Sequence, residues 1–404
     1  MKNLAPMLTT QQALATLLAA CRPITGCEII PTLTSNGRVL AADIVAPIDV
    51  PGADNSQMDG YAVNAGYAQT QSILPISQRI AAGHVGLALQ PGTAARIFTG
   101  ALLPPGADAI VMQEQCEPNA DGSAIRLLHR PQAGEWVRFI GEDIRKDSVI
   151  LTAGTRIRAQ EAGLAASVGL ATLAVQRRLK VAIFFTGDEL TMPGEPLPPG
   201  AIYNSNRFLL TALLENCGCD ISDYGIVPDN LAATRQTLRA AAAEHDVVIT
   251  SGGVSVGEED HVKPAVQAEG KLNLWQIAMK PGKPLAFGEV GPAFFLGLPG
   301  NPVSSFVTFL LFVRPFLLRL QGIADVEPRS YQLRADFDWV KADRRNEFLR
   351  ARQNAAGGLD LFPNQGSAVL SSVVWGDGLI DNPPGKTIQR GEMVKFIPFS
   401  EMMS

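Results

Sequence analysis

Between residues 179 and about 325, short apolar runs alternate with segments of helical periodicity. Residues 180–185, 221–227 and 246–250 have the composition of strands, whereas residues 206–217 and 301–320 have that of helices. This alternation predicts a parallel sheet with helices on both faces. In such a sheet, ligands bind beyond the carboxyl ends of the strands, so the loops at those ends are the first candidates for chemistry.

Asparagine and aspartate residues mark the expected starts of these helices. Asn206 is the expected N-cap of the first helix, and Asp229 or Asn230 that of an Ala-rich helix that runs to Glu244. Asn301 is the expected N-cap of the last helix. 

The chain on either side of this stretch is mainly β in character. Residues 1–178 are rich in Val, Ile, Gly and Pro apart from a helical pattern over residues 160–169, for which Gly169 is a plausible stop. Short β-type runs within residues 328–404 predict a small β-barrel or sandwich. At 404 residues the chain exceeds the size of a single hydrophobic core, so we expect two to four domains.

Composition excludes several classes of protein. Charged residues make up 18% of the chain and the net charge is −5, which argues against disorder and against binding dominated by a nucleic-acid backbone. The longest apolar stretch, residues 303–320, is interrupted by Ser, Thr, Arg and Pro, so no transmembrane helix and no membrane partner are expected. Near the N-terminus, the spacing of Ala13, Leu14, Leu17 and Leu18 favours an amphipathic helix over a signal peptide.

Cysteine and histidine give little support for a metal or redox centre. The five cysteines contain no CxxC pair, and the four histidines are scattered along the chain. Mostly buried or inert thiols in a reducing, cytoplasmic compartment are the simplest interpretation.

Two loops that follow predicted strands are rich in glycine and acid. Thr186-Gly187-Asp188-Glu189 places adjacent carboxylates at a strand end, where they can hold Mg²⁺ or water, or can be the solvated acids of an ordinary turn. Residues 251–260 (SGGVSVGEED) permit close approach of the backbone to a phosphate, and their trailing acids suit a cation. They do not form a P-loop, because GxxxxGK[ST] is absent.

A third loop is cationic. Lys280 and Lys283 lie in the sequence KPGKP, which predicts a preset clamp for an anion in an otherwise acidic protein, although two surface lysines on a turn are the alternative. The segment GLPGNP (297–302) precedes a helix whose N-terminus favours anions. Residues 51–62 and 96–101 contain similar clusters of short polar groups. They are either further loops of this kind or ordinary β-turns.

Taken together, these segments resemble the molybdopterin molybdenumtransferase family, which includes bacterial MoeA proteins and the E-domains of gephyrin and its plant counterpart. Seven segments in the same order carry the resemblance over nearly the whole chain: PGADNSQMDGYAV (51–63), RIFTGALLPPGADAIV (96–111), GED (141–143), FTGDEL (185–190), SGGVSVGEED (251–260), KPGKPLAFG (280–288) and GLPGNPVS (297–304). Gln365-Gly366-Ser367 and Ser371-Ser372 match as well.

The resemblance implies a fold of mixed α/β and β domains in an elongated, four-part chain. The expected parts are a discontinuous N-terminal domain (1–48 and 145–178), an inserted β-rich domain (49–144), a MogA-like and MoaB-like three-layer α/β/α domain that binds molybdopterin (179–327), and a C-terminal β-barrel (328–404). The resemblance further implies a homodimer whose cleft lies between the α/β domain of one subunit and the N-terminal region of the other.

The resemblance also implies a reaction. Such an enzyme inserts molybdenum from molybdate into adenylylated molybdopterin and releases AMP, with Mg²⁺ as the cofactor. Transient contacts with the molybdopterin adenylyltransferase and with recipient molybdoenzymes are implied partners.

Functional positions carry over residue by residue. The implied catalytic positions are Asp59, Thr99, Glu189, Asp229 and Asp260, with Asp59 and Thr99 serving the cleft across the dimer. The acids available to Mg²⁺ are Asp188, Glu189, Asp229 and Asp260, and Lys280 and Lys283 are expected to hold molybdate. The expected contacts to the pterin nucleotide are Ser251, Gly252, Gly253, Ser255, Gly257, Asp188, Pro299, Gly300 and Asn301.

The chain departs from the family pattern at three positions. Asn204 stands where Asp is usual, which removes one carboxylate that could contact a cation or a ribose. His261 replaces a common Tyr, and Asp147 occupies the place of a common Gly in a turn.

Two other functions stay open at this point. The adenylyltransferase of the preceding step shares the α/β domain and its SGG-type loop, but it is usually a single domain. A non-catalytic scaffold, in the manner of receptor clustering by gephyrin, would leave the motif acids and lysines without a chemical role.

Overall fold

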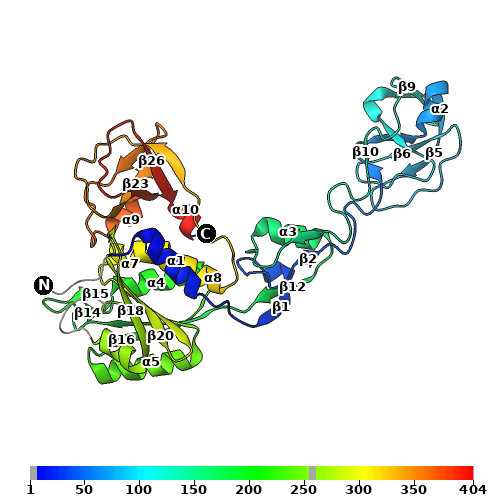
Figure 1. Cartoon of the computed structure of the whole chain (residues 1–404). Helices are drawn as coiled ribbons and strands as arrows, with labels where there is room; N and C mark the ends of the chain where they lie inside the picture. Colours follow the sequence, from blue (N-terminus) through cyan, green and yellow to red (C-terminus); the bar gives the residue numbers. More distant parts are fainter. Residues whose placement is uncertain (1–6, 254–260, 404) are drawn as a thin grey trace. The chain divides into compact units, whose positions relative to one another are not determined.

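The computed structural model of the chain describes residues 7–253 and 261–403 (Figure 1). The chain divides into two compact units, which we call the α/β unit and the β unit. The α/β unit comprises Met1–Glu28, Gly37–Ala41 and Ala174–Ser404, and the β unit comprises Ile29–Asn36 and Ala42–Leu173. The finer division into four domains stays a prediction.

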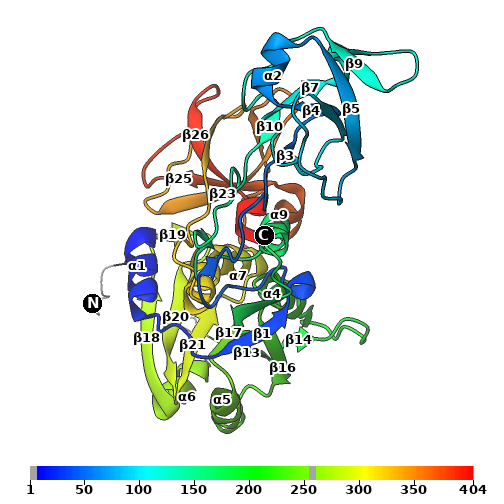
Figure 2. The ribbon, with the colours of Figure 1, turned by 90° about the vertical axis from the view of Figure 1, so that its right-hand side faces the viewer.

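A six-stranded sheet forms the centre of the α/β unit, and Figure 2 shows its strands side by side. Its order is β16 (Asp220–Val227), β13 (Lys180–Thr186), β17 (Val247–Ser251), β21 (Ala293–Leu298), β20 (Pro284–Val290) and β18 (Gly270–Gln276). The first four strands are parallel, whereas β20 pairs antiparallel with both β21 and β18. The predicted parallel sheet is thus confirmed, and the strands β20 and β18 extend it beyond β21 by antiparallel pairing.

The alternation of side chains along β13 explains why helices cover both faces of this sheet. Val181 and Ile183 pack in one core with α4 (Ser205–Asn216), α7 (Pro302–Thr308) and α8 (Arg314–Leu320). Ala182 and Phe184 pack in a separate core with α5 (Leu231–Glu244) and α6 (Val262–Glu269). Figure 1 shows α4 and α5 on opposite sides of the strands, so the predicted three-layer α/β/α arrangement is confirmed.

The long apolar segment near residue 310 is a core helix of this unit. A π-helical turn, η3 (Phe309–Val313), joins α7 to α8. The stretch Pro302–Leu320 is long and apolar enough to cross a membrane, but 89% of its most apolar window is buried inside the protein. α1 (Thr10–Ala20) packs on it through Ala13 and Leu17.

Side-chain caps set the starts of the helices. Asn204, not the expected Asn206, is the N-cap of α4, because its Oδ1 accepts a hydrogen bond from the backbone N–H of Arg207 at 3.1 Å. Asn230 caps α5 as predicted. Asn301 occupies the N-cap position of α7, but the expected side-chain cap is wrong, since its side chain accepts no hydrogen bond from the first turn of the helix. Its Nδ2 donates to Ser367 Oγ at 3.1 Å.

The C-terminal module is a curled half-barrel, in agreement with the expected β-barrel class. Its strand order is β19 (Met279–Lys280), β23 (Asn346–Gln353), β25 (Gly378–Asn382), β26 (Met393–Pro398) and β22 (Tyr331–Arg334), with β24 (Leu359–Leu361) paired to β23. Because β19 precedes β20 of the central sheet, the pairing of β19 with β23 joins the KPGKP loop to this module.

The β unit contains a further six-stranded sheet, which has its own apolar cores. The order is β7 (Ala109–Met112), β4 (Gly60–Val63), β6 (Ala94–Ile97), β5 (Ile73–Ile80), β9 (Ala124–Leu127) and β8 (Cys116–Pro118). α3 (Ala159–Ser167) ends just before Gly169, whose φ of +85° suits the predicted stop. Asp147 has a φ of +64°, a conformation that a glycine would adopt without strain.

Shorter elements complete the chain. They are β1 (Cys27–Pro31), η1 (Thr32–Thr34), β2 (Ile44–Val45), β3 (Asn55–Ser56), α2 (Ala65–Thr70), η2 (Gln113–Gln115), β10 (Val137–Arg138), β11 (Val149–Leu151), β12 (Thr172–Gln176), β14 (Leu190–Thr191), β15 (Ile202–Tyr203), α9 (Ser371–Trp375) and α10 (Phe399–Met403). All five cysteines are free thiols.

Candidate functional site

A pocket of about 720 Å³ lies at the carboxyl ends of β13, β17 and β21, and we call it the strand-end pocket. The loops that follow these three parallel strands form much of its wall. β20 runs antiparallel to β21, so the KPGKP loop that leads into β20 lies at the same edge of the sheet. Residues 365–367 of the C-terminal module line another side.

Most of the predicted binding residues of the α/β unit line this pocket. They are Glu189 from the first loop, Ser251, Gly252 and Gly253 from the second, Lys280 and Lys283 from the third, and Pro299, Gly300 and Asn301 from the loop before α7. The convergence of these loops follows from the parallel order of the strands, as the sequence predicted.

The remaining predicted residues lie elsewhere. Asp188 is exposed on the turn that carries Glu189, and Asp229 follows β16; neither lines the pocket. Asp59 and Thr99 belong to the β unit. Ser255, Gly257 and Asp260 fall outside the residues that the structure describes.

Ser251 holds two of the loops against α4. Its hydroxyl donates to the carbonyl oxygen of Pro299 at 2.9 Å and accepts from Asn206 Nδ2 at 2.8 Å. Asn206 Nδ2 also donates to the carbonyl oxygen of Gly300 at 2.7 Å. Ser251 is only 3% exposed, so its side chain shapes the pocket wall and its hydroxyl hydrogen is already committed within the protein.

Glycine is required at position 253. Gly253 has a φ of +64°, and a Cβ there would lie 2.5 Å from Cγ2 of Val262 and 3.0 Å from Oγ1 of Thr186. Gly300 is different, since its Cβ would meet only the Cα of Gly252 at 3.8 Å. A side chain would therefore clash at Gly253 but make an ordinary van der Waals contact at Gly300.

Lys280 is already paired with carboxylates. Its Nζ lies 3.1 Å from Oε1 of Glu347 and 3.4 Å from Oδ2 of Asp343. Hydrogen bonds from Arg345 hold the pKa of the Asp343 carboxyl well below its usual range, so this carboxyl stays ionised. The charge of Lys280 is thus balanced within the protein, and this pairing was not predicted from the sequence.

Lys283 presents the more available charge. Its side chain is exposed, and it makes no ion pair within residues 7–253 and 261–403. Arg345 also lines the pocket, whereas the acidic lining residue among those described is Glu189. Arg345 pairs with Asp343 at 2.9 Å, so among the described lining residues Lys283 is the cation available to an anion, although the whole chain carries a net charge of −5.

The described part of the pocket fits a metal ion that is shared with a ligand. No cluster of three or more His, Cys, Asp or Glu side chains with metal-binding geometry occurs among these residues. Glu189 offers one carboxylate, and Oδ1 of Asn206 is a buried oxygen without a hydrogen-bond partner in the described part of the chain. Mg²⁺ often takes one or two carboxylates and completes its shell with substrate phosphates and water, so this donor set suits it.

Sequence reasoning missed the contribution of the C-terminal module. Ser367 accepts a hydrogen bond from Asn301, and Gln365 exchanges two hydrogen bonds with the backbone of Arg350. The guanidinium of Arg350 is fully buried and donates to the carbonyl oxygen of Gly366, and burial lowers its pKa to about 10. The motif QGS was the available signal, but only the fold places it beside Asn301.

Asp59 and Thr99 contact each other within the β unit. Oδ1 of Asp59 accepts hydrogen bonds from both the backbone N–H and the hydroxyl of Thr99, each at 2.8 Å. These bonds hold the pKa of the Asp59 carboxyl below its usual range. The two positions that the resemblance singled out in this part of the chain therefore form one hydrogen-bonded pair.

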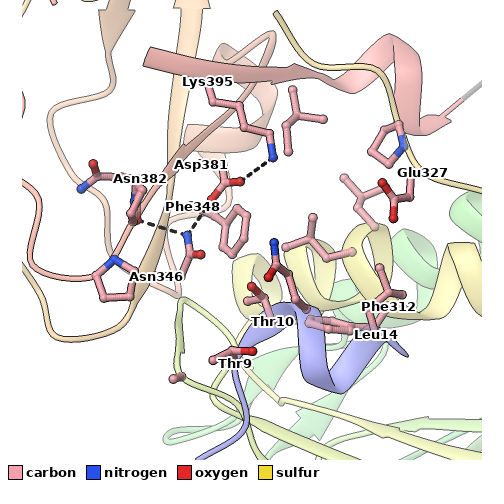
Figure 3. A pocket seen from close by; sticks show the side chains of 18 of the residues that line it. Thr9, Thr10, Leu14, Phe312, Glu327, Asn346, Phe348, Asp381, Asn382 and Lys395 are labelled. Atoms are coloured by element: carbon pink, nitrogen blue, oxygen red, sulfur yellow. Dashed lines mark hydrogen bonds and ion pairs between the residues drawn. The ribbon is translucent and has the colours of Figure 1, made fainter. Parts of the chain in front are cut away.

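A second pocket of about 670 Å³ lies beside α1, η3 and the C-terminal module (Figure 3). Leu14, Phe312 and Phe348 give it apolar walls. The polar side chains on its other side bond to one another, because Asp381 accepts hydrogen bonds from Lys395 at 2.9 Å and from Asn346 at 2.7 Å. None of the predicted site residues lines it, so the strand-end pocket is the candidate for chemistry.

Three family models match successive parts of the chain. Residues 8–169 match the MoeA N-terminal region (domain I and II), residues 182–319 a probable molybdopterin binding domain, and residues 332–399 the MoeA C-terminal region (domain IV).

Relatives and solved structures match over nearly the full length. The chain is 39% identical to a molybdopterin molybdenumtransferase of Haemophilus influenzae, over 98% of this chain and 100% of the relative. It is 38% identical to molybdopterin molybdenumtransferase 2 of Mycobacterium tuberculosis, over 92% and 94% of the two chains. A crystal structure of the molybdopterin biosynthesis moeA protein from Pyrococcus horikoshii shows 29% identity and a TM-score of 0.85, with 97% of this chain and 100% of that chain covered.

Proposed function

The chain belongs to the MoeA family of molybdopterin molybdenumtransferases, and from this membership we propose that it inserts molybdenum from molybdate into adenylylated molybdopterin and releases AMP. The observation that carries the proposal is the strand-end pocket, where glycine-rich backbone, cationic side chains and Glu189 meet. A phosphate-linked pterin nucleotide and a small oxyanion both need such a combination.

We assign the binding roles by the groups that each loop presents. The backbone of Ser251-Gly252-Gly253 and of Pro299-Gly300-Asn301 would receive the pterin nucleotide, because glycines allow close approach of N–H groups to a phosphate. Lys283 would hold molybdate, with Lys280 beside it. Lys280 shares its charge with Glu347 and Asp343, so Lys283 would carry the larger part of the attraction.

Glu189, with Asp188 on the same turn, would hold Mg²⁺ against the phosphate oxygens of the ligand. When bound, Mg²⁺ supplies positive charge that stabilises the phosphate oxygens as the link to AMP is broken. We further propose that Asp229 and Asp260 either bind the metal ion or transfer a proton. In a homodimer, Asp59 and Thr99 of the partner subunit would complete the cleft.

The test is a reconstitution with purified protein, adenylylated molybdopterin, molybdate and Mg²⁺. We expect AMP release together with a cofactor that activates an apo-molybdoenzyme. Glu189→Gln should lower the rate by about 100-fold or more without a change in melting temperature, because the side chain is exposed. Glu195→Gln, an exposed acid outside the pocket, is the matched control and should keep full activity.

Other outcomes would favour the alternatives. If the wild type binds the pterin nucleotide but releases no AMP, the scaffold role is supported and insertion is refuted. If it forms adenylylated molybdopterin from ATP and molybdopterin, it catalyses the preceding step.

A further inference from the structure

Asn204 carries an unused hydrogen-bond donor at the wall of the strand-end pocket. The residue is 2% exposed and lines the pocket. Its Nδ2 is buried and has no hydrogen-bond partner among residues 7–253 and 261–403. A buried donor without an acceptor costs free energy, so the site gains stability from any ligand that supplies one.

The orientation of this amide is determined by the helix that it caps. Oδ1 of Asn204 accepts from the backbone N–H of Arg207 at 3.1 Å, and an N–H group can only donate. Rotating the amide by half a turn would place Nδ2 against that N–H group. Oδ1 therefore faces the helix and Nδ2 is the atom left for another acceptor.

The surroundings of Asn204 favour an acceptor that carries negative charge. α4 is 12 residues long, and the positive end of its dipole is at Asn204. Lys280 and Arg345 line the same pocket but are paired with Asp343 and Glu347, so Lys283 is the lining cation without an ion pair in the described ranges. A phosphate oxygen satisfies the donor, the helix dipole and the surrounding charge together.

We propose that Nδ2 of Asn204 donates a hydrogen bond to a phosphate oxygen of the bound nucleotide, so that this subsite binds the phosphate without a metal ion. An aspartate at this position would present a carboxylate oxygen, which repels a phosphate unless a cation lies between them. Asn204 is thus a specificity-determining residue, because it presents a hydrogen-bond donor where an aspartate would present an acceptor. The inference rests on the proposed function, because it takes the nucleotide part of the substrate as the ligand of this pocket.

Asn204→Asp tests the proposal with a nearly isosteric change. An aspartate can still accept from the N–H of Arg207 and is a good N-cap, which offsets part of the cost of a charge at a position that is 2% exposed. The melting temperature of each variant is therefore measured beside its affinity. Only the atom that has no partner among the described residues changes, from a donor to a charged acceptor. Asn204→Ser keeps a capping oxygen, removes the donor and adds no charge, and it serves as the second variant.

The readout is binding of AMP and of adenosine by calorimetry, in EDTA and in Mg²⁺. In EDTA, Asn204→Asp should weaken AMP binding by at least 10-fold and adenosine binding by less than 2-fold, with Asn204→Ser between the wild type and Asn204→Asp. Added Mg²⁺ should restore AMP binding to Asn204→Asp more than to the wild type. Asn230→Asp, the same change at the N-cap of α5 and outside the pocket, should alter neither ligand's affinity.

Each contrary result has a distinct meaning. Equal AMP affinity of wild type and Asn204→Asp in EDTA would overturn this inference and leave the proposed function standing. An equal loss for adenosine would show that Asn204 contacts a neutral group, and binding of AMP to the wild type only with Mg²⁺ would refute a metal-independent contact. A wild type that binds AMP under neither condition would overturn both the inference and the proposed nucleotide site.

Discussion

Nζ of Lys280 lies 3.1 Å from Oε1 of Glu347, whose side chain is only 1% exposed. The parallel pairing of β19 with β23 places these two residues opposite each other. Glu347 also accepts a hydrogen bond from Nε1 of Trp339 at 2.8 Å. A residue of the KPGKP loop is therefore the counter-ion of a buried carboxylate in the C-terminal module.

Glu347→Gln should destabilise the protein by about 1–3 kcal/mol, because it removes the negative charge that balances Lys280 at a buried position. Denaturation in urea, monitored by circular dichroism, measures this. Glu392→Gln breaks a more exposed pair with Lys386 in the same module and should cost less than about 1 kcal/mol. Equal losses in the two variants would contradict a structural role for the Lys280–Glu347 pair.

Lys283→Ala should raise the apparent KM for molybdate by about 10-fold, the equivalent of about 1.4 kcal/mol, while the free energy of unfolding changes by less than about 0.5 kcal/mol. The reason is that its exposed side chain has no ion-pair partner in the described part of the chain. The cofactor reconstitution assay at varied molybdate concentration measures the effect. Lys271→Ala changes an exposed lysine outside the pocket and is the control. An unchanged KM in Lys283→Ala would show that Lys283 does not bind molybdate.

Gly253→Ala should destabilise the protein by about 2 kcal/mol or more, since a Cβ there meets Val262 at 2.5 Å on a backbone with positive φ. Gly300→Ala places the same methyl group in ordinary van der Waals contact with the Cα of Gly252 at 3.8 Å, so its stability should match that of the wild type within about 0.5 kcal/mol. The two urea midpoints, measured side by side, separate the steric effect from the loss of a glycine. A stable Gly253→Ala variant would show that the turn can relax.

The contribution of Glu269 to stability should depend on pH. Hydrogen bonds from Arg239 and Arg235 lower the pKa of this carboxyl from its ordinary value of 4.5 to about 2. Because the folded pKa lies below the unfolded one, the stabilisation is present above about pH 4.5 and is lost as the pH falls towards 2. The difference in melting temperature between wild type and Glu269→Gln should therefore be constant near neutral pH and shrink below about pH 4.5.

The control for this pH series is Glu244→Gln, on α5 like the two arginines. The Glu244 side chain is exposed and forms no ion pair among the residues described, so its melting difference should stay nearly flat over the same range. A Glu269→Gln difference that persists undiminished at low pH would contradict the assigned ion pairs.

Much of the α/β unit was predictable because its signals are local. Residues 180–185 and 246–250 form apolar strand patterns, and they became β13 and β17 within one or two residues at each end. The choice of N-cap for α4 was not predictable from composition, because Asn204 and Asn206 are two residues apart and both suit the role. The backbone path after β15 decided it in favour of Asn204.

The other walls of the strand-end pocket could not be predicted in this way. Arg345 and Gln365 reach the pocket only because β23 pairs with β19, across more than 60 residues of sequence. No local pattern near either residue indicates that contact, since pairing between distant segments depends on how the whole unit packs.

The sequence by itself determined the alternating strands and helices, the family of the chain and the convergence of three glycine-rich loops at one sheet edge. Each of these depends on side chains close together in the chain, or on the rule that parallel strands end at the same edge. Only the tertiary structure decided which charges in the pocket are already balanced and which donor is left without a partner. Lys280 is neutralised by a carboxylate 67 residues away, and Nδ2 of Asn204 is left over by the cap of its own helix, because both outcomes depend on three-dimensional proximity and burial.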